Sequence, residues 1–229
     1  MKIHKISFSK AKKINIYQVL SRNKILIVEK CFTKKSMEQA KKELINFFKL
    51  KKFNFTKSRN KKLFHRWDHN PKKARYKRIM CSTTFDLKDI RYFKNCINIL
   101  KKGIFLKKNY MKNYFRINNE NKTEFKFEPR GSLYPKGGGY YQFHSDFFSG
   151  EKILDVIPLS NINNDFQEGG LTVIKKKKRI NLEPFLKPGS IVLMDSIIKH
   201  GILPIDNKEK LKKKLLTGRF SLISVMNHI

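Results

Sequence analysis

The second half of the chain alternates short apolar runs with turn residues. Runs rich in Ile, Val, Leu, Phe and Tyr are separated by Gly137-Gly138-Gly139, Gly169-Gly170 and Pro188-Gly189. Apolar runs bounded by such residues predict β-strands. We expect eight strands, at 126–134, 139–147, 152–159, 170–175, 178–183, 190–194, 197–203 and 217–226. Short, evenly spaced strands are typical of a jelly roll built from two sheets.

The first half of the chain follows a helical period instead. Residues 23–28 predict a strand, and apolar residues at steps of three and four in 37–49 predict a helix. The same spacing predicts a second helix over 86–102. Residues 103–124 are basic and rich in Asn, which predicts a long connection. Residues 50–80 are basic and irregular, which indicates a loop; it could form a lid over a substrate site, but simple surface packing is the more favoured interpretation.

The length and composition indicate one globular domain. A chain of 229 residues with 40% hydrophobic content can bury a sizeable core. Together the elements predict a mainly β fold with flanking helices, of the α+β class, in which residues 1–124 support a core formed by residues 125–229. No apolar run reaches the 18 residues of a membrane-spanning helix, and no secretory signal is visible, so we expect a cytoplasmic protein. The three cysteines lack metal-ligand spacing and indicate free thiols.

The net charge is strongly positive. The chain carries 52 Lys and Arg against 18 Asp and Glu, which gives +34. Such a field attracts polyanions, so an anionic substrate, a nucleic acid or another acidic partner is compatible with it. The lysines are scattered in short runs over the whole chain, and a solvated basic surface explains them most simply.

One stretch carries candidate metal chemistry. It is Tyr140-Tyr141-Gln142-Phe143-His144-Ser145-Asp146, and His200 follows 54 residues after Asp146. Side chains of a strand alternate between its faces, so His144 and Asp146 would project to the same side. Two imidazoles and one carboxylate occupy one face of an octahedral ion, an arrangement that suits Fe(II). A His-x-Asp motif alone often arises by chance, so its surroundings must support the interpretation.

These surroundings resemble a known family. The segments, in chain order, are Arg130-Gly131-Ser132-Leu133-Tyr134-Pro135, His144-Ser145-Asp146, Gly169-Gly170-Leu171-Thr172-Val173, Pro188-Gly189-Ser190-Ile191-Val192-Leu193, His200 and Arg219-Phe220-Ser221. Their conjunction resembles the Fe(II)/2-oxoglutarate-dependent dioxygenase superfamily over roughly residues 125–227, and more loosely over 23–50. The resemblance implies a double-stranded β-helix core, a jelly-roll or cupin-like fold, with the N-terminal helices packed outside. The whole chain, 1–229, would then form one oxygenase domain.

The resemblance also implies roles for single residues. His144, Asp146 and His200 would be the iron ligands and form the catalytic centre. Arg219 would pair with the distal carboxylate of 2-oxoglutarate, because a planar guanidinium fits a carboxylate well. Ser221, two residues on, and Tyr134 would help to hold this cosubstrate. The family's arginine usually lies ten or eleven residues after the distal histidine, where this chain has Lys210; Arg219, 19 residues after His200, has the strand-like context.

The implied activity is the hydroxylation of a C–H bond with Fe(II), 2-oxoglutarate and O₂, releasing succinate and CO₂. Asp146 favours hydroxylation or desaturation over halogenation, because halogenating relatives replace this carboxylate. The substrate would be an unidentified small molecule or peptide. Tyr140 and Gln142 lie at even steps from His144 on the same strand and are predicted to face the cavity and contact the substrate. Trp67 would be the apolar contact of a lid. The alternatives are a cupin-like metal-binding isomerase or small-molecule binder, and a basic nucleic-acid-binding protein.

Overall fold

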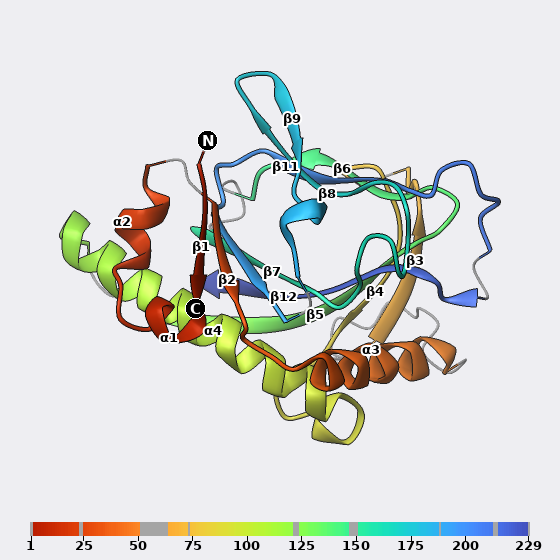
Figure 1. The fold of residues 1–229 in the computed structure, drawn as a ribbon. Helices are drawn as coiled ribbons and strands as arrows, with labels where there is room; N and C mark the ends of the chain where they lie inside the picture. The colour runs from red at the N-terminus through yellow and green to blue at the C-terminus, as the bar shows by residue number, and fades with distance from the viewer. Residues whose placement is uncertain are drawn as a thin grey trace.

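The strands curl around a central space, and two long helices run along one outer side (Figure 1). This computed structural model describes residues 2–22, 25–50, 64–72, 74–120, 124–146, 151–187, 189–212 and 215–228. The strands pair in the order β1-β2-β10-β7-β12-β5-β4-β6-β11-β8-β9, with β3 added next to β4. The fold is mainly β with flanking helices, as the sequence predicted.

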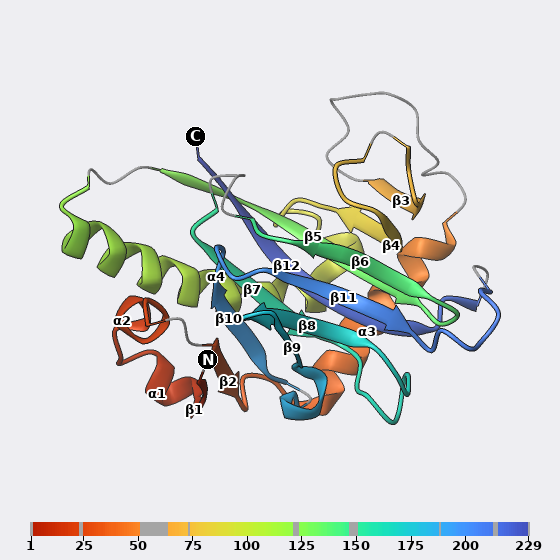
Figure 2. The same ribbon diagram turned by 90° about the horizontal axis from the view of Figure 1, so that it is seen from above.

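The strands divide between two faces of the central space. One face contains β1 (Ile3–Ser7), β2 (Ile25–Glu29), β10 (Ile191–Asp195), β7 (Ile153–Pro158), β12 (Gly218–His228) and β5 (Phe125–Pro135). The sheet continues through β4 (Arg78–Thr84), with β3 (Phe64–His69) at its side, to β6 (Gly139–His144), β11 (His200–Ile205), β8 (Gly170–Lys175) and β9 (Lys178–Asn181). Figure 2 shows the two longest strands, β5 and β12, running antiparallel as direct neighbours, while β11 belongs to the opposite face between β6 and β8.

The helices cover the outer side of the first face. They are α1 (Phe8–Ala11), α2 (Ile16–Leu20), α3 (Lys34–Lys49) and α4 (Ile90–Asn118). The hydroxyl of Thr33 accepts a hydrogen bond from the amide of Ser36 and caps the start of α3. The apolar faces of α3 and α4 pack on the sheet and form one core cluster, while a second cluster lies inside the strands and includes Tyr134, Leu171 and Ile202.

Two expectations for the first half were wrong. Residues 103–124 do not form a long connection, because α4 continues to Asn118. Its apolar face extends past residue 102 and is buried through Ile104, Leu106, Tyr110, Met111 and Phe115. Part of the segment 50–80, expected to be irregular, forms β3 and the start of β4; residues 51–63 lie outside the described residues. The division of the chain at residue 124 stays a prediction, although β4 pairs directly with β5 and β6.

The eight strands expected after residue 125 are all present, with shifted ends. The lysine-rich segment between β8 and β9 is a hairpin whose turn residues Lys176 and Lys177 have φ of 44° and 66°. The three cysteines are buried free thiols. Within the described ranges, no helix combines the length and the apolarity needed to cross a lipid bilayer.

Candidate metal centre

Three side chains from distant parts of the sequence meet inside the sheet. His144 ends β6 and His200 begins β11, and the two residues are direct cross-strand partners. The Nε2 atoms of His144 and His200 lie 3.5 and 3.4 Å from the two carboxylate oxygens of Asp146. One ligand atom from each residue lies within 4.8 Å of the others. The three groups are therefore close enough to hold one ion.

Backbone carbonyls orient both imidazoles. Nδ1 of His144 lies 2.9 Å from the carbonyl oxygen of Gln142, and Nδ1 of His200 lies 2.9 Å from that of Ile198. A carbonyl can only accept, so Nδ1 carries the proton of each neutral ring and Nε2, on the side of Asp146, keeps the lone pair that can bind a metal. Burial, and then the neighbouring His200, lower the pKa of His144 below its usual value. The neutral form that binds a metal is thus favoured.

The carboxylate of Asp146 approaches the two imidazoles from a residue outside β6. The strand expected to continue to residue 147 ends at His144, and Asp146 lies in a bend. The amide of Asp146 donates a hydrogen bond of 3.0 Å to the carbonyl of Ser196, directly after the end of β10. Burial alone would raise the pKa of Asp146, but its interactions with His200 and His144 lower the pKa overall. Asp146 is therefore ionised at neutral pH.

The three residues line a cavity of about 310 Å³ between the two faces of the sheet. Alternate residues of β12 form one wall, since side chains of a strand point to opposite faces in turn. These residues are Arg219, Ser221, Ile223, Val225 and Asn227. Their cross-strand partners on β5 add Tyr134, Ser132 and Arg130 to the same wall. Leu154, Val156, Leu171 and Ile202 give the cavity an apolar lining.

Arg219 is fully buried and only partly paired. Its Nε donates to the carboxylate of Glu183, which is also buried. Both terminal nitrogens of Arg219 are shielded from solvent and find no hydrogen-bond partner among the described residues. Arg219 and Ser221 are both in the cavity wall with Tyr134, so all three residues expected to hold the cosubstrate share one cavity with the triad. Lys210, which has the usual spacing for the arginine, is exposed in the loop before β12.

Tyr134 is a hydrogen-bond donor at any physiological pH. Burial, opposed by the charge of Arg219, raises the pKa of its phenol to about 12. The guanidinium carbon of Arg219 lies 5.9 Å from the centre of the tyrosine ring. The two side chains thus present a cationic and a neutral donor from neighbouring strands.

Glu183 was not anticipated from the sequence. It begins the short 3₁₀ helix η3 (Glu183–Phe185) after β9, and its Oε1 also accepts a hydrogen bond of 2.7 Å from the amide of Leu171. A glutamate after a strand is ordinary in sequence, so no local signal indicates its burial. Its contact with Arg219 exists only because β8 and β12 border the same cavity.

The sequence predicted that Tyr140 and Gln142 face the substrate cavity, and the structure places both outside its lining. Neither lines the cavity: the hydroxyl of Tyr140 donates to the side chain of Asn70, and Oε1 of Gln142 accepts from the amide of Lys77. The register of β6 against β11 shifts between His144 and Tyr141. This β-bulge reverses the alternation, so Tyr141 lines the cavity instead.

Trp67 does not lie over the cavity either. It is on β3, paired with Cys81, and packs partly buried against the core cluster under the helices. From the segment between β3 and β4, Tyr76 comes near the triad, with its ring centre 5.0 Å from that of His144. Asp68 on β3 pairs with Arg66 and Arg78, and the guanidinium of Arg78 lies 5.6 Å from the centre of the Tyr141 ring. The segment before β4, and not Trp67, therefore borders the site.

Comparisons with known proteins address the fold. No family profile and no curated protein sequence matches the chain. The solved structures that match include a prolyl-4-hydroxylase from Pseudomonas putida, with a TM-score of 0.61 and 17% identity over 90% of this chain and 92% of the other. They also include a prolyl hydroxylase from Trichoplax adhaerens, solved with a hypoxia inducible factor peptide fragment, with a TM-score of 0.51 and 13% identity over 94% and 90%. The chain therefore has the double-stranded β-helix fold of the 2OG-Fe(II) oxygenases, as its motifs predicted.

Proposed function

We propose that this protein is an Fe(II)- and 2-oxoglutarate-dependent oxygenase that hydroxylates a C–H bond of its substrate. One molecule each of 2-oxoglutarate, O₂ and substrate would give succinate, CO₂ and the hydroxylated product. One oxygen atom enters succinate and the other enters the new hydroxyl group. The two structures named above are prolyl hydroxylases, which supports hydroxylation over desaturation.

The half-paired guanidinium of Arg219 carries this proposal. Leaving a buried donor without a partner costs about 1–3 kcal/mol, and more for a charged group. Both terminal nitrogens of Arg219 are in this state, on the wall of the cavity that contains the triad. A planar guanidinium is suited to a carboxylate that accepts two parallel hydrogen bonds. A carboxylate-bearing cosubstrate of the metal fits both features at once.

The triad has the donor set that Fe(II) requires. His144 and His200 offer imidazole nitrogens and Asp146 offers a carboxylate oxygen, so three positions of an octahedral ion stay open. Iron bound there would supply the activation of O₂. A structural zinc site would instead need a fourth protein ligand, and the triad is the one group of suitable ligands that the described part of the chain brings together.

The remaining residues would orient the cosubstrate and exclude water. Glu183 holds Nε of Arg219, so the terminal nitrogens point in one fixed direction. Tyr134 and Ser221 add hydroxyl donors on the same wall. The apolar lining strengthens these interactions, because charges attract more strongly where water is excluded.

A spectroscopic titration tests the proposal. Fe(II) and 2-oxoglutarate are added to the purified protein without oxygen, and a weak visible charge-transfer band is expected. His144→Ala should abolish the band. Arg219→Gln should weaken 2-oxoglutarate binding by about 100-fold, the loss of a bidentate charged pair, while Fe(II) binding measured by calorimetry persists. Folded protein that gives no band would contradict the assignment.

A control variant and a product assay complete the test. Arg179 is an exposed arginine on β9 outside the cavity, so Arg179→Gln should leave the band and its cosubstrate dependence unchanged. With oxygen, succinate should form from 2-oxoglutarate. Metal binding without any succinate would identify the cupin-like binder in place of the oxygenase.

A further inference from the structure

Basic side chains form a straight stripe along the outer face of α4. Between the non-helical residue Phe93 and Arg116, the exposed positions of this helix follow steps of three and four residues. They are Lys94, Asn98, Lys101, Phe105, Lys108, Lys112 and Arg116. At 100° per residue they lie within about 80° of the helix circumference, and they span about 33 Å at 1.5 Å per residue. The five cations among them are called the α4 stripe.

No carboxylate neutralises this stripe. The 29 residues of α4 include no Asp or Glu. Asp89 precedes the helix and Glu120 follows it. Within the described ranges, none of the five cations makes an ion pair. Glu43 of α3 lies next to α4, but its carboxylate accepts hydrogen bonds from the amides of Asn95 and Cys96. Lys108 lies over the ring of Phe127 and Arg116 donates to the side chain of Asn113, but like charges at steps of three and four repel each other and no carboxylate offsets this repulsion.

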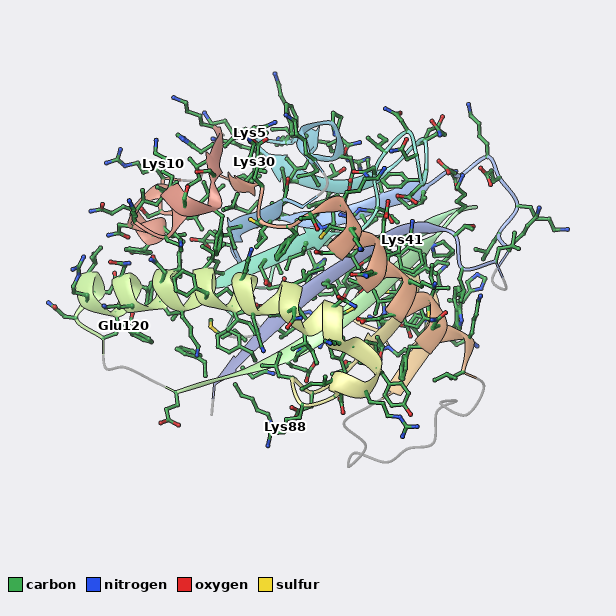
Figure 3. The ribbon with its side chains drawn as sticks, turned by 60° about the horizontal axis from the view of Figure 1, so that its bottom comes forward. Lys5, Lys10, Lys30, Lys41, Lys88 and Glu120 are labelled. Carbon is green, nitrogen blue, oxygen red and sulfur yellow. The ribbon has the colours of Figure 1, made fainter. Side chains whose placement is uncertain are left out.

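The stripe faces away from the metal centre. Lys107, on the opposite side of α4, points into the protein and contacts Glu151 and Asp155. Figure 3 views the molecule from this side: α4 crosses the front, and no other helix covers it. Lys88 and Glu120, near its two ends, are labelled there. The stripe is therefore accessible while the cavity is in use.

Phe105 lies in the middle of the stripe and is 45% exposed. The other exposed apolar residues of α4, Ile90 and Ile117, lie near the helix ends, about 18 Å or more from Phe105 along the axis. Such sparse apolar residues do not form a face that could enter a lipid surface. A row of cations with one accessible aromatic ring instead matches a linear polyanion whose bases can stack.

We infer that α4 is a docking surface for single-stranded nucleic acid. The phosphates lie along Lys94, Lys101, Lys108, Lys112 and Arg116, and one base stacks on Phe105. The inference goes beyond the proposed oxygenase activity and does not depend on it. RNA and DNA share the phosphate chemistry, so both are included in the test.

Fluorescence anisotropy with labelled 20-nucleotide oligouridylate and oligothymidylate tests the inference. Five phosphate contacts on a single strand predict a log–log salt slope of about −3.5, or about 100-fold weaker binding at 200 mM than at 50 mM salt. Replacing Lys94, Lys101, Lys108 and Lys112 by Gln leaves one contact and should reduce the slope to about −0.7. Replacing the same four by Arg should preserve binding, and Phe105→Ala should weaken it about tenfold.

The β8–β9 hairpin provides a control with the same change in charge. Lys175, Lys176, Lys177 and Lys178 replaced by Gln also remove four charges, but from a different surface. This variant should keep the slope and most of the affinity. Equal losses in both Gln variants would show attraction by net charge alone and overturn the inference. Binding of phosphatidylserine vesicles through the stripe, without oligonucleotide binding, would overturn it too, whereas a preference for RNA or DNA would support it and identify the source.

Discussion

Two buried cations lie on opposite sides of β12, and their surroundings differ. On the helix side, Nζ of Lys107 contacts Glu151 at 2.5 Å and Asp155 at 3.0 Å and also donates to the carbonyl of Ser224. The hydroxyl and amide of Ser224 in turn donate to Asp155, at 2.7 and 2.9 Å. On the cavity side, Arg219 has one carboxylate at Nε and two terminal nitrogens without described partners.

The difference separates a cation whose donors are all satisfied from one with donors left over, which we propose bind the cosubstrate. All three donors of the Lys107 ammonium have an acceptor, so this cluster has no capacity left and serves to attach α4 to the sheet. Arg219 keeps two terminal nitrogens that no described residue satisfies. Both side chains are fully buried, so burial alone does not distinguish their roles. The number of unsatisfied hydrogen-bond donors distinguishes them.

The largest expected effect comes from breaking the satisfied cluster. Lys107→Met leaves Glu151 and Asp155 buried without a cation, which should lower the free energy of unfolding by about 3–5 kcal/mol. Urea denaturation measures this change. Lys108→Met, at the exposed neighbouring position, should change it by less than about 0.5 kcal/mol. Similar small values for both variants would remove the structural role from Lys107.

The second prediction concerns Arg219, the buried cation with unsatisfied donors. Because a ligand that binds only the folded state stabilises it, 2-oxoglutarate at 100 times its Kd, with Fe(II) and without oxygen, should raise the free energy of unfolding by about 2.7 kcal/mol. Arg219→Gln should remove most of this gain at the same concentration. Glutaramide, which has the same five-carbon chain but no carboxylate, is the matched compound and should stabilise neither protein. A gain that survives in Arg219→Gln would place the cosubstrate elsewhere.

A smaller effect is expected from the residue that positions Arg219. Glu183→Gln keeps an oxygen for the amide of Leu171 but removes the charge that holds Nε. We expect about tenfold weaker 2-oxoglutarate binding, or about 1.4 kcal/mol, with Fe(II) binding unchanged. The exposed Glu168→Gln is the control. An unaltered affinity in Glu183→Gln would show that Arg219 needs no orientation by this carboxylate.

The smallest effect is a pH dependence in the metal-free protein. Burial raises the pKa of Glu151 above its ordinary 4.5, although Lys107 opposes the shift. The folded state therefore binds this proton more tightly than the unfolded state, and the stability that Glu151 contributes at pH below 4.5 is lost as the pH rises through the raised value. Unfolding measured from pH 4 to pH 7 should show a smaller decline in Glu151→Gln. An identical decline in both proteins would refute the shift.

Much of the cavity could be predicted because glycine and proline residues mark the ends of its strands in the sequence. The apolar runs and glycines after residue 125 indicated all eight strands, and the strand context of Arg219 distinguished it from Lys210. The failures arise where a local rule is changed by a distant contact. Alternation placed Gln142 in the cavity, but the bulge between β6 and β11 put Tyr141 there. The basic, Asn-rich composition after residue 102 hid the long apolar face of α4.

The order of side chains along the strands is a property of the sequence alone. It determined that His144, His200 and the alternate residues of β12 could share an interior, since strand geometry repeats every two residues. Tertiary structure decided how the interior is completed. The bend that returns Asp146 to the imidazoles depends on Ser196, and the direction of Arg219 depends on Glu183, 36 residues away. Such contacts join residues whose separation along the chain carries no periodic signal, so only the folded sheet brings them together.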